Sequence, residues 1–142
     1  MVRRQFPQLV PDIMPFKAPT TDQRFVLDHI AKPPIAEGRL SPWDRDIREL
    51  ARSENVFCKL SGMVTEARWH DWKPEDFRPY LDVVVDTFTP ARLMIGSDWP
   101  VCTASAPYSR TVALVRDYIA TLTSNEQNSI LGENCARFYR VS

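Results

Sequence analysis

Three short apolar runs constrain the fold most, because each one ends in polar residues and they recur along the chain. They begin near residues 24, 55 and 92, and read RFVLDH, NVFCKL and RLMIG. Runs of this length, bounded by turn residues, are typical of buried strands. Helical patterns fill the intervals between them. This alternation predicts right-handed β-α-β units, and therefore an α/β fold with about three parallel strand-helix units.

The segments between and after the strands carry helix signals. The clearest one is 74–88, where apolar residues from Phe77 to Phe88 fall on one continuous helical face. A Ser-Pro pair opens the segment 41–51, and proline is well tolerated at the first helical position. Three further helices are expected near the C-terminus, at 108–122, 124–131 and 133–139.

Two of the expected helix boundaries rest on individual residues. Ser124 and Gln127 have the spacing of a capping box for the helix 124–131, and Gly132 is placed to end it. Near the N-terminus, residues 5–17 have helical spacing that Pro11 and Pro15 interrupt, which predicts a broken helix.

Composition excludes several classes of protein. The 142 residues predict one domain, 1–142, and the 18 basic and 18 acidic residues cancel, which argues against nucleic acid as a partner. No apolar run is long enough to cross a membrane, and no signal peptide is visible. The three cysteines contain no C-x-x-C pair, so neither a disulfide framework nor a structural zinc site is expected. A cytoplasmic location is the corresponding expectation.

Polar side chains follow every predicted strand. The first strand ends at Asp28 and His29, the second at Lys59 and Ser61, and the third at Ser97 and Asp98. Because the carboxyl ends of parallel strands meet at one edge of a sheet, these groups should gather there. A carboxylate can act as general base towards water, and an imidazole can orient a substrate or bind a metal. A lysine can stabilise negative charge.

Each of these residues also has a purely structural interpretation. Asp98 could be a helix cap or an ion-pair partner, and His29 could be a hydrogen-bonded core residue. Lys59 could extend outward from its strand, and Trp99 could wall a substrate pocket or simply pack. The residues alone leave these alternatives open.

Four blocks of the chain together resemble the amidohydrolase-related family. They are RFVLDHIAKPP from residue 24, VFCKLSGM from 56, RLMIGSDWPVC from 92 and ILGENCARFYRV from 130. Their order and spacing are most similar to the sugar-lactonase, L-fuconolactonase-like branch. The resemblance implies the C-terminal portion of a (β/α)8 TIM barrel, and a hydrolase in which water attacks a lactone carbonyl. It implies a small-molecule substrate such as a sugar-acid lactone.

The resemblance also implies roles for particular residues. Asp98 matches the family's aspartate at the end of the last barrel strand, which implies a general base. His29 matches a histidine that orients substrate or, in metal-using members, ligates the metal. Lys59 matches a lysine that implies contact with the substrate. Trp99 is expected to bind substrate from its position beside Asp98 alone.

One family motif has no match in this chain. The family opens its barrel with an H-x-H motif, whereas the two histidines here are His29 and His70. A divalent metal such as zinc, which full-length members can use, would find two candidate ligands here, where a catalytic site needs about three. The prediction is therefore an incomplete barrel with no metal site of its own. The alternative is a truncated, catalytically inactive fragment that folds or associates without turnover. The exposed sheet edges of such a chain favour a homo-oligomer.

Overall fold

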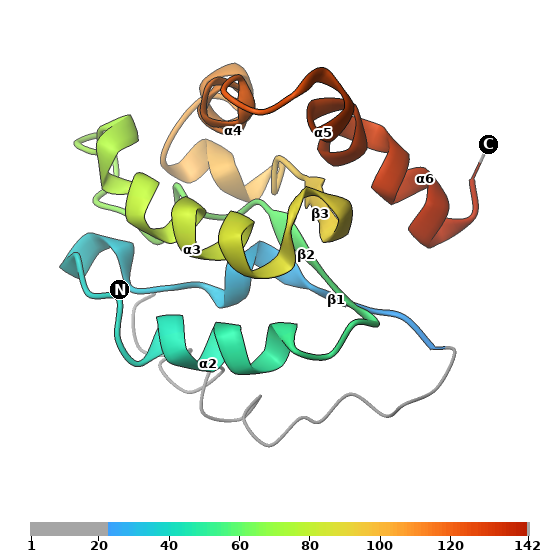
Figure 1. Ribbon diagram of the computed structural model, residues 1–142. Helices are drawn as coiled ribbons and strands as arrows, with labels where there is room; N and C mark the ends of the chain where they lie inside the picture. The colour runs from blue at the N-terminus through green and yellow to red at the C-terminus, as the bar shows by residue number, and fades with distance from the viewer. Residues whose placement is uncertain (1–22, 142) are drawn as a thin grey trace.

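The computed structural model describes residues 23–141, and Figure 1 shows their arrangement. The broken helix expected at 5–17 lies outside this range. Within it, the elements alternate between strand and helix in the predicted order.

A three-stranded parallel sheet lies at the centre of the fold. Its strands β1 (Phe25–Leu27), β2 (Val56–Leu60) and β3 (Leu93–Ile95) are arranged in sequence order. In the register, Leu27 of β1 is opposite Cys58 of β2, which is opposite Leu93 of β3. The parallel sheet is confirmed, and within the described residues it is open, with β1 and β3 at its edges.

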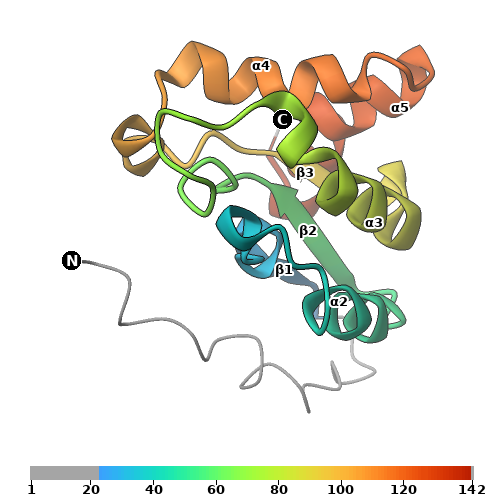
Figure 2. The same cartoon turned by 90° about the vertical axis from the view of Figure 1, so that its left-hand side faces the viewer.

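Five α-helices lie among residues 23–141. They are α2 (Trp43–Ala51), α3 (Arg78–Phe88), α4 (Tyr108–Ile119), α5 (Ser124–Asn128) and α6 (Asn134–Tyr139). Figures 1 and 2 show α2 and α3 side by side against the sheet, with α4 and α5 beyond the edge formed by β3. A short 3₁₀ turn, Pro74–Asp76, precedes α3, so the predicted helix 74–88 is divided in two.

The C-terminal helix boundaries differ from the prediction. Thr123, not Ser124, caps α5, and its side chain forms the capping box with Glu126. Gly132 does not end the helix, because a π-helical turn, Ser129–Glu133, carries the chain directly into α6. The buried side chain of Ile130 holds this turn against the core, and tertiary packing therefore overrides the local stop signal.

The two faces of the sheet have different surroundings, since successive side chains of a strand point to opposite sides. One face carries Cys58, Leu60 and Leu93, which belong to the buried core shared with α2 and α3. The other face carries Phe57 and Lys59. The ring of Phe57 lies 5.1 Å from the ring of Phe138, so α6 covers part of this second face.

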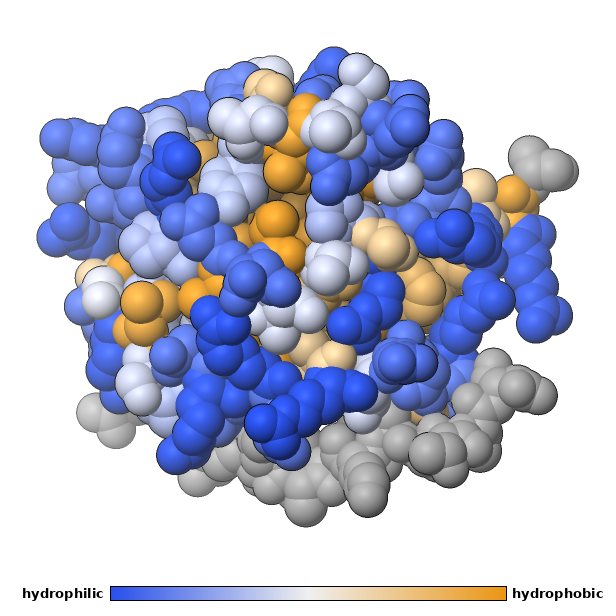
Figure 3. Space-filling model, in the orientation of Figure 1, coloured by the Kyte–Doolittle hydropathy of each residue, from blue (hydrophilic) through white to orange (hydrophobic). Residues whose placement is uncertain are grey.

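The surface seen from the side of α2 and α3 is mostly hydrophilic, with apolar residues visible between the helices (Figure 3). Among the described residues, no helix is both long and apolar enough to cross a membrane.

Candidate active site

The carboxyl edge of the sheet brings three polar side chains together. His29 comes from the turn after β1, Ser61 from the end of β2, and Asp98 from the loop after β3. Nδ1 of His29 lies 2.8 Å from Oγ of Ser61. Nε2 of the same ring lies 3.5 Å from Oδ1 of Asp98. The imidazole therefore connects the ends of all three strands, as the predicted gathering of polar groups requires.

The site is partly shielded from solvent. The side chain of His29 is 26% exposed and that of Asp98 is 13% exposed, whereas Ser61 is only 3% exposed. At 3.5 Å the contact between His29 and Asp98 is longer than an ordinary hydrogen bond. The Asp98 carboxylate therefore keeps lone pairs that could accept a proton from water.

The sequence predicted His29 at the end of a strand. In the structure it lies in an unusual turn that follows the strand. Strand β1 ends at Leu27, and His29, Ile30, Ala31 and Lys32 all have positive φ, at 55°, 45°, 59° and 50°. Consecutive left-handed residues other than glycine are unfavourable, and they persist only where the surroundings enforce them. This turn directs the imidazole across the sheet edge towards Asp98.

Gly62 makes room for the imidazole. Its φ is +62°, and a Cβ added there would lie 2.6 Å from both Cβ and Cγ of His29. No other residue type fits without moving the histidine. Both residues that follow β2 therefore contribute to the site. Ser61 provides a hydroxyl partner for His29, and Gly62 leaves space for its ring because it has no side chain.

Asp98 also has a left-handed backbone, with φ of 57°. Its carbonyl oxygen accepts a 2.9 Å hydrogen bond from the amide of Cys102, which ties it to the following 3₁₀ turn, Val101–Ala104. Such strain at a non-glycine residue is common at functional sites. The turn holds the carboxylate against His29.

Lys59 makes its ion pair with a neighbour on the same sheet face. Its Nζ lies 2.8 Å from Oδ1 of Asp28 and 5.9 Å from the ring centroid of Tyr139. The hydrogen bond with Asp28 is the main cause that raises the pKa of Lys59, so the lysine is held in its charged form. The two neighbouring residues therefore have different partners. Asp28 pairs with Lys59, and His29 contacts Asp98.

Trp99 follows Asp98 but points largely into solvent, since 67% of it is exposed. Its amide donates a 3.2 Å hydrogen bond to Oγ of Ser97. Contact of Trp99 or Lys59 with a substrate stays a prediction.

The donor set does not amount to a metal centre. Among residues 23–141, no three histidine, cysteine, aspartate or glutamate side chains lie close enough together to hold an ion. His29 and Asp98 supply two potential ligands, and a catalytic zinc site takes about three from the protein.

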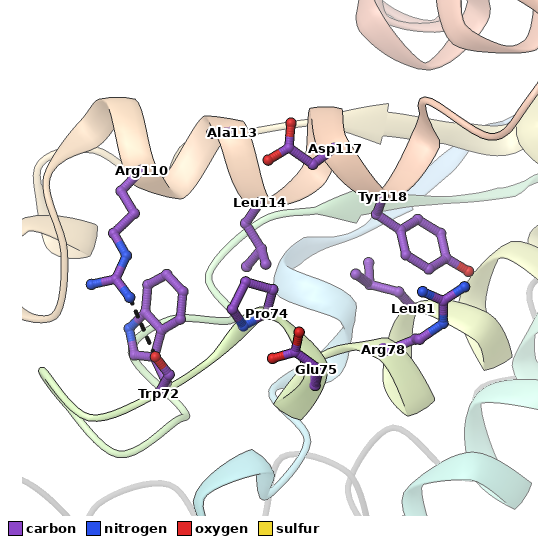
Figure 4. Close-up of a pocket in the computed structure, with 10 residues that line it drawn as sticks. All are labelled: Trp72, Pro74, Glu75, Arg78, Leu81, Arg110, Ala113, Leu114, Asp117 and Tyr118. Carbon is purple, nitrogen blue, oxygen red and sulfur yellow. Dashed lines mark hydrogen bonds between the residues drawn. The ribbon is translucent and has the colours of Figure 1, made fainter.

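A cavity of about 240 Å³ lies elsewhere, between α3 and α4 (Figure 4). Arg110 stacks on Trp72 at one end of it, 3.9 Å from the ring centroid. Leu81 and Leu114 line its apolar part. None of the predicted site residues lines this cavity, so we place the candidate chemistry at the sheet edge and not here.

The sequence places Ser61 among the polar residues at the strand ends but predicts no role for it, and it predicts no place for Gly62 in the site. The contacts of Ser61 and Gly62 with His29 depend on the left-handed turn, which no local sequence pattern predicts.

Comparisons with known proteins identify similar chains. A family model described as amidohydrolase matches residues 3–141. The chain is 40% identical to an L-fucono-1,5-lactonase of Burkholderia multivorans, over 96% of this chain and 49% of that protein. It is 39% identical to an L-fucono-1,5-lactonase of Burkholderia ambifaria, over 95% of this chain and 48% of that protein. The chain thus spans about half the length of these curated relatives.

A solved structure is similar to the same extent. It is the crystal structure of an amidohydrolase from Burkholderia multivorans with bound zinc. The TM-score is 0.88 at 40% sequence identity, and the match covers 96% of this chain and 51% of that one. The described sheet and helices therefore have the same arrangement as about half of that chain.

Proposed function

Because this chain belongs to the amidohydrolase family, and its sheet and helices are the C-terminal part of a (β/α)8 barrel, we propose that it serves the hydrolysis of a lactone. The observation that carries this proposal is the imidazole of His29, which lies between Ser61 and Asp98 at the carboxyl edge of the sheet. Active sites of such barrels form at this edge. The similarity to L-fucono-1,5-lactonases favours a sugar-acid lactone as substrate.

Asp98 is the general base in this proposal. Its carboxylate accepts a proton from water while the water oxygen bonds to the lactone carbonyl carbon. The tetrahedral intermediate then breaks its bond to the ring oxygen, which takes the proton back from Asp98. The product is the open-chain hydroxy acid, and Asp98 returns to its carboxylate form.

The other predicted residues bind and orient. His29 holds the substrate against Asp98 by hydrogen bonding through Nε2, which lies on the side of the carboxylate. Lys59, charged beside Asp28, provides positive potential at the same sheet edge. Trp99, exposed next to Asp98, offers an apolar wall to a sugar ring.

The steps proposed above involve no divalent metal. The similar structure from Burkholderia multivorans contains zinc, but the described residues of this chain provide only His29 and Asp98 as adjacent donors. A third ligand would have to come from outside residues 23–141. The proposed proton transfers use only Asp98.

The competing proposal is a chain that folds or associates without turnover. Two observations favour it. The described residues provide two adjacent potential metal ligands and not three, and the chain matches about half of each relative. Light scattering tests association. A compact monomer that binds no lactone would favour the inactive alternative, whereas a well-defined dimer would favour an assembled barrel.

Titration of the acid released from L-fucono-1,5-lactone at constant pH tests the proposed activity directly. Asp98→Asn should lower the rate by about 10²- to 10⁴-fold, the usual contribution of a general base. Asp86→Asn is the matched control, because Asp86 is exposed and pairs with Arg48 on the surface. Equal rates for wild type and Asp98→Asn would remove Asp98 as the base. No release by any of the three proteins would favour the inactive alternative.

A further inference from the structure

The contact between Ser61 and His29 admits two directions. Nδ1 of His29 and Oγ of Ser61 lie 2.8 Å apart, at the distance of a strong hydrogen bond. Either atom could be the donor, because a serine hydroxyl donates or accepts and the imidazole has two tautomers. The other ring nitrogen decides between the two arrangements.

Nε2 of His29 faces a group that accepts. It lies 3.5 Å from Oδ1 of Asp98, and an ionised carboxylate has lone pairs but no proton to donate. A bare Nε2 would direct its own lone pair at this negative charge. The arrangement of lowest energy therefore has the ring proton on Nε2. In a neutral ring Nδ1 is then the acceptor, and the Ser61 hydroxyl must be the donor.

We propose that Ser61 is a positioning residue, which donates to Nδ1 of His29 and so presents an Nε2–H group to the space beside Asp98. The catalytic meaning of this arrangement rests on the proposed lactone hydrolysis, whereas the direction of the hydrogen bond does not. In the reaction, the Nε2–H group is available to a substrate oxygen, while the neighbouring carboxylate remains free to accept a proton from water.

The surroundings leave little room for other ring positions. Ser61 is 3% exposed, so solvent has little access to its hydroxyl. On one side the missing side chain of Gly62 leaves just the space that the imidazole fills. On the other, the left-handed turn sets the direction of the Cα–Cβ bond. Without its donor, Nδ1 would be an unpaired acceptor in a shielded position.

The tautomer can be measured directly, because the chain has two histidines. Long-range proton–nitrogen correlation NMR at about pH 8, where imidazole is ordinarily neutral, distinguishes a protonated from an unprotonated ring nitrogen. His70→Gln assigns the signals. We expect an unprotonated Nδ1 and a protonated Nε2 for His29. A protonated Nδ1 would overturn the proposal.

Two variants test whether Ser61 is the donor. In Ser61→Ala, the Nδ1 signal should move to the position of an imidazole nitrogen that accepts no hydrogen bond. Ser105→Ala is the control, since Ser105 is 1% exposed and its hydroxyl accepts a bond from Trp72 instead. An Nδ1 signal that does not move in Ser61→Ala, or moves equally in both variants, would contradict the assignment.

A second pair of variants guards against misfolding. Ser61→Thr keeps the hydroxyl and Ser61→Val has the same shape without it, so only the valine variant should lose the Nδ1 shift of the wild type. These measurements require no turnover. Failure of the lactonase assay and failure of this proposal are therefore separate results.

Discussion

The indole of Trp43 donates a 2.8 Å hydrogen bond to the carbonyl oxygen of Ile30, in the left-handed turn that carries His29. Both residues are buried, with Trp43 2% and Ile30 0% exposed. The first residue of α2 thus satisfies a backbone group of the turn, where no water could do so. The core residue Trp43 therefore stabilises the turn that carries His29, in addition to the contacts that Ser61 and Gly62 make with the imidazole.

Replacement of Trp43 by phenylalanine should destabilise the fold and loosen this turn. The variant keeps an aromatic ring but leaves the carbonyl of Ile30 unpaired, which costs about 1–3 kcal/mol of unfolding free energy. Urea denaturation measures the loss. Trp69→Phe is the control, because Trp69 makes the same kind of bond, to the carbonyl of Thr65, while 51% exposed. Losses of the same size in both variants would argue against a special role for the buried bond.

Gly62→Ala should displace His29, whereas Gly38→Ala should not. Both glycines have positive φ, at +62° and +65°, so both variants carry a similar backbone strain of about 1–2 kcal/mol. Only at Gly62 does the new methyl meet another side chain, 2.6 Å from His29. We expect a larger loss of stability for Gly62→Ala, together with a changed His29 nitrogen spectrum. An unchanged spectrum would show that the loop accommodates the methyl without moving the ring.

Asn134 should be among the most sensitive polar residues of the C-terminal region. Its side-chain amide is fully buried and donates 2.7 Å hydrogen bonds to the carbonyls of Pro90 and Leu93, which anchors α6 to the start of β3. Asn134→Ala leaves both carbonyls without this donor and should cost about 2–4 kcal/mol. Asn125→Ala, at an exposed position in α5, should change the unfolding free energy by less than about 0.5 kcal/mol. Chemical denaturation of the two variants compares them.

Alkaline pH should destabilise the protein in part through Tyr118. Burial, and next its hydrogen bond to Asp82, raise the pKa of Tyr118 above its ordinary value. The unfolded chain therefore releases this proton at a lower pH than the folded one. Stability is retained below the ordinary tyrosine pKa of about 10 and falls as pH rises above it. Tyr118→Phe should be less stable near neutrality, because the bond to Asp82 is lost, and should decline less steeply above about pH 10. Urea denaturation across this range would contradict the prediction if the two slopes were equal.

Much of the fold follows from local patterns, and the exceptions have physical causes. The strands and the long helix α3 were predictable because apolar periodicity reports directly on burial. The cap of α5 was misplaced by one residue because Thr123 and Ser124 are both good caps, and only the backbone decides between them. The prediction that Gly132 ends the helix is wrong, because Ile130 packs in the core and the helical turn continues through Gly132.

The sequence alone determined which chemical groups stand at the ends of the strands, because alternation of strand and helix implies a parallel sheet whose carboxyl ends converge. His29, Lys59 and Asp98 could all be named in this way. Only the tertiary structure decided how they pair. In the structure Lys59 pairs with Asp28, whereas His29 contacts Asp98 and Ser61. The imidazole lies across the sheet edge because a left-handed turn directs it there. Trp43 stabilises this turn, and Gly62 leaves room for the ring. Such a turn is unfavourable in isolation, so no local pattern could predict it.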